Sequence, residues 1–252
     1  MLEAVRLVKR FGGVTAVNAL DFRVAEGEIV GLIGPNGAGK TTLIDLLTGD
    51  QLPTSGRITY RGRDITTSPP QVRNRLGLAR TFQITRPFLS MTVHDNVMTG
   101  ALFGRQGRRL RLDAARTETH RILDRVGLTP MAGARASALT TAGKKRLEVA
   151  RCLATSPSLL FLDEPLSGLN GREVDEALRM IREISRSGVT IVFIEHIVPA
   201  VTAVSDRIVV VANGAKIAEG TPAEILAHHE VKRAYLGDVR GTAARYAAGE
   251  AP

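Results

Sequence analysis

The chain has 252 residues, a formal net charge of +9 and a single cysteine, Cys152. This length is enough for a sizeable core, either as one large domain or as a core with a smaller subdomain. One cysteine excludes an intrachain disulfide and fits a reducing compartment. No apolar run reaches the roughly 18 residues that a membrane span requires, and the N-terminus has no apolar signal region. We therefore expect a soluble, cytoplasmic protein.

The positive charge raises the question of an anionic partner, either a nucleic acid or a membrane surface. Arginines are densest between Arg105 and Arg125. Aromatic residues make up only 4% of the chain and tryptophan is absent, so stacking platforms for single-stranded nucleic acid are scarce. We interpret the arginine-rich stretch as a solvated helical face, with weak attraction to anionic lipid headgroups as the alternative. We expect no specific nucleic-acid partner.

The N-terminal part of the chain begins with strand signals. Residues 2–9 and 16–24 alternate between apolar and polar side chains, and Phe11–Gly13 between them is a turn signal. Phe11 has two interpretations, as a packing residue of the turn or as a ring that stacks on a nucleotide base. The apolar run Ile29–Ile33 is short enough for a buried strand.

The glycine-rich stretch after this run carries the clearest chemical signal. Gly34, Gly39, Lys40 and Thr41 satisfy the pattern G-x-x-x-x-G-K-[ST] of the phosphate-binding P-loop, between a predicted strand and a predicted helix. Backbone N–H groups of such a loop point at phosphate oxygens, and the helix N-terminus adds its positive dipole end. We expect Lys40 on the β- and γ-phosphates and the Thr41 hydroxyl on Mg²⁺. The predicted nucleotide-binding residues here are Phe11, Gly34, Pro35, Asn36, Gly37, Ala38, Gly39, Lys40, Thr41 and Thr42.

Several local signals follow the P-loop helix. Gly49 is its predicted C-cap. The segments Arg57–Tyr60 and Asp64–Thr66 are spaced as the two strands of a hairpin. Ser68–Gln71, with the sequence Ser-Pro-Pro-Gln, predicts a capping box with proline at the first helical position. Leu78–Gln83 predicts a short strand that ends in a polar residue.

From about residue 87 to residue 150 the apolar spacing becomes that of amphipathic helices, which predicts a helical insertion into an α/β core. Ser158–Glu164 is then a predicted buried strand that ends in two carboxylates. The helix after it carries an apolar stripe. The residues of this stripe are Val174, Leu178, Ile181 and Ile184.

The last part of the chain continues the alternation of strands and helices. Val189–Ile194 is a predicted buried strand, followed by Glu195 and His196. Two further strands, Arg207–Val211 and Ala215–Ala218, turn at Asn213-Gly214, and Thr221–Glu224 caps a C-terminal helix. Strands that alternate with helices predict a parallel, doubly wound sheet.

The predicted fold class is α/β, a P-loop NTPase (RecA-like) core with an N-terminal antiparallel β subdomain and an inserted α-helical subdomain. The core with its antiparallel subdomain is predicted to comprise residues 1–86 and 151–240. The helical subdomain comprises residues 87–150, and residues 241–252 form a loose tail.

Polar side chains at the ends of the predicted strands form a candidate active site. Asp163 is placed as a Walker-B aspartate that holds Mg²⁺ through water, and Glu164 to polarise the water that attacks the γ-phosphate. Two adjacent carboxylates are costly to bury unless a cation neutralises them. His196 follows the next strand at the ligand-binding edge of such a sheet, so we assign it a catalytic role. Gln83, at another strand end, is predicted to coordinate Mg²⁺ or to orient the attacking water.

Taken in order, these motifs resemble those of an ATP-binding-cassette ATPase over almost the whole chain. Within that family the chain most closely resembles the ATP-binding subunits of bacterial branched-chain amino acid importers. The closer resemblance is carried by the segments Lys9–Gly13, Arg80–Gln83, Arg146–Arg151, Gly168–Asn170, Ile194–His196 and Ala234–Gly237.

The resemblance implies an ATPase that uses ATP and Mg²⁺ and works in an assembly. Two cassettes, identical or different, would enclose two ATP molecules, each between the P-loop of one cassette and the signature segment of the other. The pair would ride on two membrane-spanning permease subunits at the cytoplasmic face of the bacterial inner membrane, with a periplasmic solute-binding protein delivering the solute. The segment around Ile84–Leu89 resembles the surface that meets the permease. The alternatives are a urea- or lipopolysaccharide-type transporter subunit and a soluble cassette ATPase that acts on nucleic acid.

The signature segment departs from the family pattern. Where Leu-Ser-Gly-Gly-Gln or a close variant is usual, residues 139–143 are Leu-Thr-Thr-Ala-Gly. The resemblance implies that Thr140, Ala142 and Gly143 contact the nucleotide held by the partner cassette. Thr140 keeps a hydroxyl for this contact. Thr141 and Ala142 place Cβ atoms where glycine would let the backbone approach phosphate closely, so we expect a weakened signature half.

Overall fold

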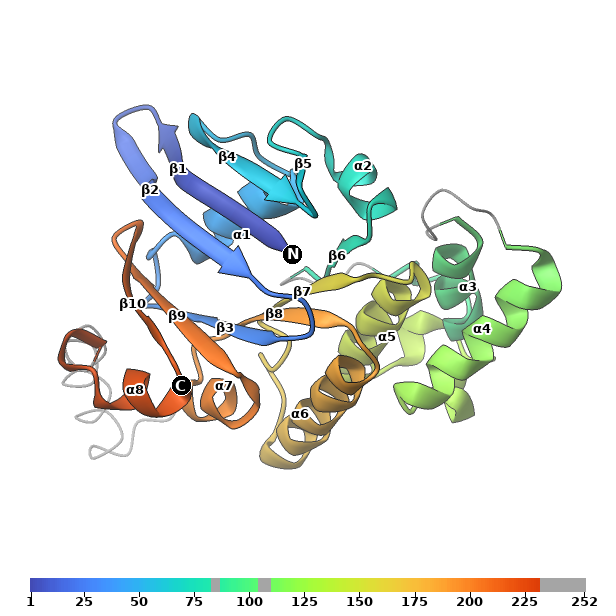
Figure 1. Ribbon diagram of the computed structural model, residues 1–252. Helices are drawn as coiled ribbons and strands as arrows, with labels where there is room; N and C mark the ends of the chain where they lie inside the picture. Colours follow the sequence, from blue (N-terminus) through green and yellow to red (C-terminus); the bar gives the residue numbers. More distant parts are fainter. Residues whose placement is uncertain (83–86, 104–109, 232–252) are drawn as a thin grey trace.

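The computed structural model describes residues 1–82, 87–103 and 110–231, and its strands form two sheets. The first sheet is antiparallel, has the order β2-β1-β4-β5, and stands at the upper left of Figure 1. Its strands are β1 Leu2–Phe11, β2 Val14–Val24, β4 Ser55–Tyr60 and β5 Arg63–Asp64.

The second sheet runs through the middle of the molecule in the order β10-β9-β3-β8-β7-β6. Strands β9, β3, β8, β7 and β6 are parallel to one another, and the edge strand β10 is antiparallel to β9. The strands are β3 Ile29–Ile33, β6 Leu78–Arg80, β7 Leu159–Asp163, β8 Thr190–Ile194, β9 Arg207–Ala212 and β10 Ala215–Gly220.

Helices cover both faces of this sheet, and α3, α4 and α5 pack together at the right of Figure 1. The helices are α1 Lys40–Thr48, α2 Pro70–Arg75, α3 Val93–Phe103, α4 Leu112–Arg125, α5 Thr141–Ala154, α6 Gly171–Arg186, α7 Val198–Val204 and α8 Pro222–Ala227. Short 3₁₀ turns span Thr129–Met131 and Ala136–Ala138. Within the described ranges, none of these helices has the length and hydropathy that a membrane crossing requires.

The alternation along the central strands sorts the buried side chains into two cores. In β3, Val30 and Leu32 pack toward α1 and the antiparallel sheet. Ile29 and Ile33 pack into the opposite core, which contains α5, α6 and α7. Strands covered on both faces are mostly apolar. The fully buried β3, β7 and β8 follow this rule except at Asp163, the last residue of β7, and Thr190, the first residue of β8. The predicted α/β fold class is therefore confirmed.

Three local predictions are also confirmed. Gly49 ends α1 in the left-handed conformation, with φ 88°. Asn213 and Gly214 both have positive φ, 48° and 76°, as a two-residue hairpin turn between β9 and β10 requires. Thr221 and Glu224 form both bonds of a capping box at the start of α8.

Two predictions near the centre of the chain are wrong in detail. Ser68 does not cap α2, because the N-cap is Pro69 and no side-chain bond caps that end. Pro70 keeps the preceding residue extended, so the helix cannot begin before Pro70. The strand β6 ends at Arg80, earlier than predicted, because the Phe82 N–H donates to Glu148 Oε1 of α5 at 2.8 Å and so leaves the sheet.

Candidate active site

The P-loop joins the buried end of β3 to the first turn of α1. A Cβ atom at Gly34 would overlap the carbonyl oxygen of Val211 in β9, and one at Gly39 would overlap that of Ala16 in β2. Gly39 also has φ 97°, which L side chains rarely adopt. These two glycines are therefore required by the close packing of the loop between neighbouring strands as well as by any phosphate.

The remaining P-loop residues divide into an anchored part and an exposed part. Ala38 is 3% exposed, and its carbonyl oxygen accepts a bond from Gly214 N–H at 3.0 Å. Pro35 and Thr42 are half-buried. Asn36, Gly37 and Thr41 are exposed, so the tip of the loop and the Thr41 residue at the start of α1 face solvent.

Lys40 folds back over this loop. Its side chain is buried, and its Nζ donates to the carbonyl oxygens of Gly34 at 2.6 Å and Pro35 at 3.0 Å. Burial lowers the pKa of Lys40, while the carboxylates of Glu164 and Asp163 act in the opposite direction. The ammonium group is thus held between the loop and the acidic edge of the sheet.

Strand register gathers the predicted catalytic residues at one edge. Leu32 in β3 pairs with Ile194 in β8, and Ile194 pairs with Asp163 in β7. Since these strands are parallel, the P-loop, Glu164 and His196 all follow strands that end at the same level. The prediction that the site lies where these strands end depends on their being parallel.

Asp163 is buried at 4% exposure and ends β7. Its carboxylate accepts a bond from Arg80 Nη2 at 2.8 Å, and its backbone N–H donates to Thr81 Oγ1 at 3.1 Å. Burial lowers the pKa of Arg80, but the hydrogen bonds to Asp163 and Asp45 outweigh it and hold that pKa above its ordinary value. In the sequence Arg80 stands out only as part of the family segment Arg80–Gln83, and its contact with Asp163 could not be predicted from that segment.

Glu164 turns the chain away from the sheet in a strained backbone conformation. Its φ is 46°, in the left-handed region that costs a non-glycine residue roughly 1–2 kcal/mol. Backbone hydrogen bonds hold it there. Its N–H donates to Ile194 O at 3.0 Å, and its carbonyl accepts from Lys145 Nζ at 2.8 Å and from Ser167 N–H at 3.3 Å. Lys145 belongs to α5, so the signature-bearing helix touches the backbone of the predicted catalytic glutamate.

Glu195 is a second residue that sequence analysis did not single out. Its side chain is fully buried, and burial raises the pKa of its carboxyl group. Oε1 accepts from Leu166 N–H at 2.8 Å, and Oε2 accepts from His196 N–H at 3.3 Å. The His196 side chain is 54% exposed. Glu195 therefore ties the segment after Glu164 to the exposed histidine.

Phe11 lies at the end of β1 beside the β1–β2 turn, with 48% of its side chain exposed. Lys9 Nζ lies 4.9 Å from the centroid of its ring. The same hairpin reaches the P-loop, because Ala16 packs against Gly39. An exposed aromatic ring therefore lies on the hairpin that contacts the phosphate-binding loop.

The signature segment lies at the start of α5. Thr140 is the N-cap of this helix, and its hydroxyl oxygen accepts a bond from Gly143 N–H at 3.2 Å. Thr140 and Thr141 are exposed, whereas Ala142 is 9% exposed. In the described part of the chain, no hydrogen bond or ion pair joins this segment to residues 34–42.

The donor chemistry fits a Mg²⁺ ion that is held jointly with a nucleotide. Thr41 presents a hydroxyl and Asp163 a carboxylate, which are oxygen ligands of the kind that Mg²⁺ prefers. Among the residues described, no group of three or more His, Cys, Asp or Glu side chains is arranged to hold a metal on its own. Phosphate oxygens and water would complete such a site. Gln83, the remaining predicted ligand, lies outside the described residues, as do the tail 241–252 and the segment Ala234–Gly237.

A parallel sheet with a P-loop, a strand-terminal Asp-Glu pair and a histidine at the same edge defines a P-loop nucleoside triphosphatase. Residues 17–167 match the family model described as ABC transporter, and residues 215–240 match that of the branched-chain amino acid ATP-binding cassette transporter. The chain belongs to the ABC transporter family, as one of its ATP-binding ATPase subunits.

Named relatives extend over nearly the whole chain. The high-affinity branched-chain amino acid transport ATP-binding protein LivG of Salmonella typhimurium is 44% identical, and the alignment covers 94% of this chain and 98% of LivG. The corresponding protein BraF of Pseudomonas aeruginosa is 40% identical over the same shares of the two chains.

Solved structures agree with the architecture. MJ1267, an ATP-binding cassette of an ABC transporter solved in its ADP conformation, superimposes with a TM-score of 0.84 at 29% sequence identity. The superposition covers 94% of this chain and 98% of MJ1267. A nucleotide-free ATP-binding cassette from an ABC transporter gives a TM-score of 0.82 at 27% identity.

Proposed function

We propose that the chain is the ATP-hydrolysing subunit of an importer for branched-chain amino acids at the cytoplasmic face of the bacterial inner membrane. The observation that carries this proposal is the 44% identity to LivG over almost both full lengths. The match of residues 215–240 to the branched-chain cassette model supports the same substrate class. That segment includes β10 and α8.

In this proposal each residue of the site has a separate role in ATP hydrolysis. The backbone N–H groups of the P-loop and Lys40 bind the β- and γ-phosphates. Glu164 accepts a proton from the water as the water oxygen attacks the γ-phosphorus and ADP leaves. His196, anchored through its backbone to Glu195, contacts the γ-phosphate. Mg²⁺, held by Thr41 and Asp163 and in our prediction Gln83, would neutralise phosphate charge.

The second half of each site would come from another cassette. The exposed turn at Thr140 and Thr141 places the N-terminus of α5 where a phosphate from outside the chain could approach it, and the Thr140 hydroxyl bonds Gly143 N–H of the first turn. Ala142, the residue after Thr141, is 9% exposed. We propose that the Cβ atoms of Thr141 and Ala142 keep the backbone N–H groups of this segment from approaching the phosphate closely, so that each signature segment with this sequence forms a weakened half of its site.

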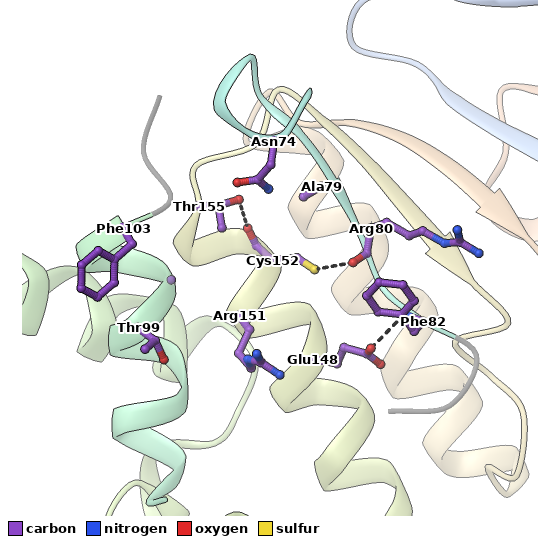
Figure 2. Close-up of a pocket in the computed structure, with 11 residues that line it drawn as sticks. Asn74, Ala79, Arg80, Phe82, Thr99, Phe103, Glu148, Arg151, Cys152 and Thr155 are labelled. Atoms are coloured by element: carbon purple, nitrogen blue, oxygen red, sulfur yellow. Dashed lines mark hydrogen bonds between the residues drawn. The ribbon is translucent and has the colours of Figure 1, made fainter. Parts of the chain in front are cut away.

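The proposed permease contact is the groove of about 410 Å³ shown in Figure 2, between β6, α3 and α5. Phe82 and Phe103 line it and are 42% and 60% exposed. Arg151 also lines it, and its guanidinium lies 4.6 Å from the ring centroid of Phe88. Exposed aromatic rings beside charged groups suit a cytoplasmic helix of a permease subunit.

The proposed function is tested by reconstitution. We expect the chain to co-purify with two permease subunits and to drive uptake of labelled leucine into proteoliposomes when ATP and the solute-binding protein are supplied. A preparation that carries Glu164→Gln is the matched control and should not accumulate leucine. Accumulation of urea without leucine uptake would instead favour the urea-type transporter, and assembly without permeases on nucleic acid would contradict transport altogether.

Phe11 provides a test of base stacking. Phe11→Ala should weaken ATP binding by about 1–3 kcal/mol, the range of base–aromatic stacking, because it removes the exposed ring on the hairpin that contacts the P-loop. Phe11→Tyr keeps a ring and should be almost neutral. Calorimetric titration with ATP measures both variants. Unchanged affinity in the alanine variant would return Phe11 to the role of a turn-packing residue.

A further inference from the structure

Arg80, the last residue of β6, lies at the centre of an acidic cluster. Its side chain is 9% exposed, and its guanidinium reaches three carboxylates, two in or directly after α1 and one at the end of β7. Nη2 donates to Asp163 Oδ2 at 2.8 Å, and Nη1 donates to Asp45 Oδ1 at 2.5 Å and to Asp50 Oδ2 at 3.3 Å. One positive charge therefore serves three carboxylates, and one of these is the buried Walker-B aspartate.

The charge on Asp163 requires a nearby cation. Its side chain is 4% exposed, and a buried carboxylate without a cation or hydrogen-bond donors is strongly unfavourable. Arg80 supplies that cation from within the protein. In the proposed site Mg²⁺ would bind this same carboxylate. Arg80 and Mg²⁺ would therefore both interact with Asp163.

Hydrogen bonds hold the backbone around Arg80 on both sides. They restrict how far the guanidinium could move if Mg²⁺ also bound Asp163. Cys152 Sγ–H of α5 donates to the Arg80 carbonyl at 3.2 Å, and Thr81 N–H donates to Phe161 O at 2.9 Å. In Figure 2 the Arg80 carbonyl faces Cys152 while the guanidinium extends away from the groove. Its far end is held by Asp45. These contacts favour a guanidinium that remains hydrogen-bonded to Asp163.

We propose that Arg80 is a positioning residue of the nucleotide site, which neutralises Asp163 without a metal and shares this carboxylate with Mg²⁺. The inference rests on the proposed role of Asp163 toward Mg²⁺. Because the guanidinium already satisfies the carboxylate, free Mg²⁺ gains too little to bind the protein alone. Phosphate oxygens then make up the missing interaction, so that Mg²⁺ enters the site together with ATP.

Arg80→Met tests this inference without any measurement of activity. Methionine is a long side chain like arginine but has no charge. The carboxylates of Asp163, Asp45 and Asp50 would then lie near one another without the guanidinium between them. In the absence of nucleotide, Mn²⁺ affinity measured by electron paramagnetic resonance should rise at least about tenfold over the wild type. The melting temperature should fall, and 10 mM Mg²⁺ should raise it again by roughly 3 °C or more. The wild type should show no such rise.

Two matched variants separate this role from a general structural one. Asp45→Asn also breaks an Arg80 contact but leaves Asp163 paired, so it should lower the melting temperature without creating a response to Mg²⁺. The double variant Arg80→Met/Asp163→Asn removes the uncompensated carboxylate. It should be more stable than Arg80→Met, an interaction of the kind that neighbouring groups show, and should lose most of the gain in Mn²⁺ affinity. This variant also keeps the test open if Arg80→Met does not fold.

The inference is overturned if Arg80→Met binds Mn²⁺ no better than the wild type, or if the double variant is no more stable than Arg80→Met. Either result would mean that Arg80 only holds α1 in place, through its contact with Asp45. Asp163→Asn alone examines the proposed site separately. If the gain in ATP affinity on adding Mg²⁺ is the same in Asp163→Asn and in the wild type, Asp163 is not the Mg²⁺ ligand and the proposed site itself is wrong.

Discussion

Glu164→Gln should abolish ATP turnover, with a loss of about 10²–10⁴-fold or more, while ATP binding stays intact. The amide has the size and hydrogen-bonding capacity of the carboxylate but cannot accept the proton of the attacking water. The hydrogen bonds from Glu164 N–H to Ile194 O and from Lys145 Nζ to Glu164 O involve the backbone of this residue. These backbone bonds should persist in the variant.

The same variant should trap two cassettes around uncleaved ATP. Removing a negative charge beside the γ-phosphate reduces repulsion in the closed pair. Phosphate release at saturating Mg²⁺ and ATP measures turnover, calorimetry measures binding, and light scattering measures the dimer. Glu3→Gln, on the exposed face of β1, is the control and should leave all three unchanged. Rapid hydrolysis by Glu164→Gln would show that another group, such as His196 or Glu195, activates the water.

The nucleotide site could be predicted from the sequence where its chemistry is local. The P-loop needs a fixed spacing of Gly34, Gly39, Lys40 and Thr41 within one strand–loop–helix unit. Asp163 and Glu164 follow an unbroken apolar run, which marks the end of a buried strand. The parallel order of the strands then brings these segments to one edge without further information.

What the sequence could not reveal depends on contacts between distant residues. Arg80 lies 83 positions from Asp163 and 35 from Asp45, and nothing in the local pattern says which carboxylates its guanidinium will meet. The early end of β6 has a similar cause, since Glu148 of α5 takes the N–H of Phe82.

Lys40→Ala should remove most of the ATP affinity. In the proposed complex the ammonium group makes charge-assisted bonds to the β- and γ-phosphates, each worth about 1.5–3 kcal/mol, so the expected loss is roughly 10²–10⁴-fold in Kd. Lys40→Met should behave alike because it keeps the length of the side chain without the charge. Lys216→Ala in β10 removes a lysine paired with Glu219 and should bind ATP as the wild type does.

The fold of the Lys40 variants should survive, and this makes the measurement interpretable. Lys40 is buried at 8% exposure, and its burial lowers the pKa of its ammonium group, so the charge is held in the protein at a desolvation cost. Loss of the hydrogen bonds to Gly34 and Pro35 should lower the free energy of unfolding. Removal of the buried charge should offset part of this decrease. Circular dichroism should show a folded protein, and calorimetric titration with ATP and Mg²⁺ then reports the site alone. Affinity within about threefold of the wild type, a change of less than about 0.7 kcal/mol, would mean that the backbone N–H groups of the loop bind the phosphates without the lysine.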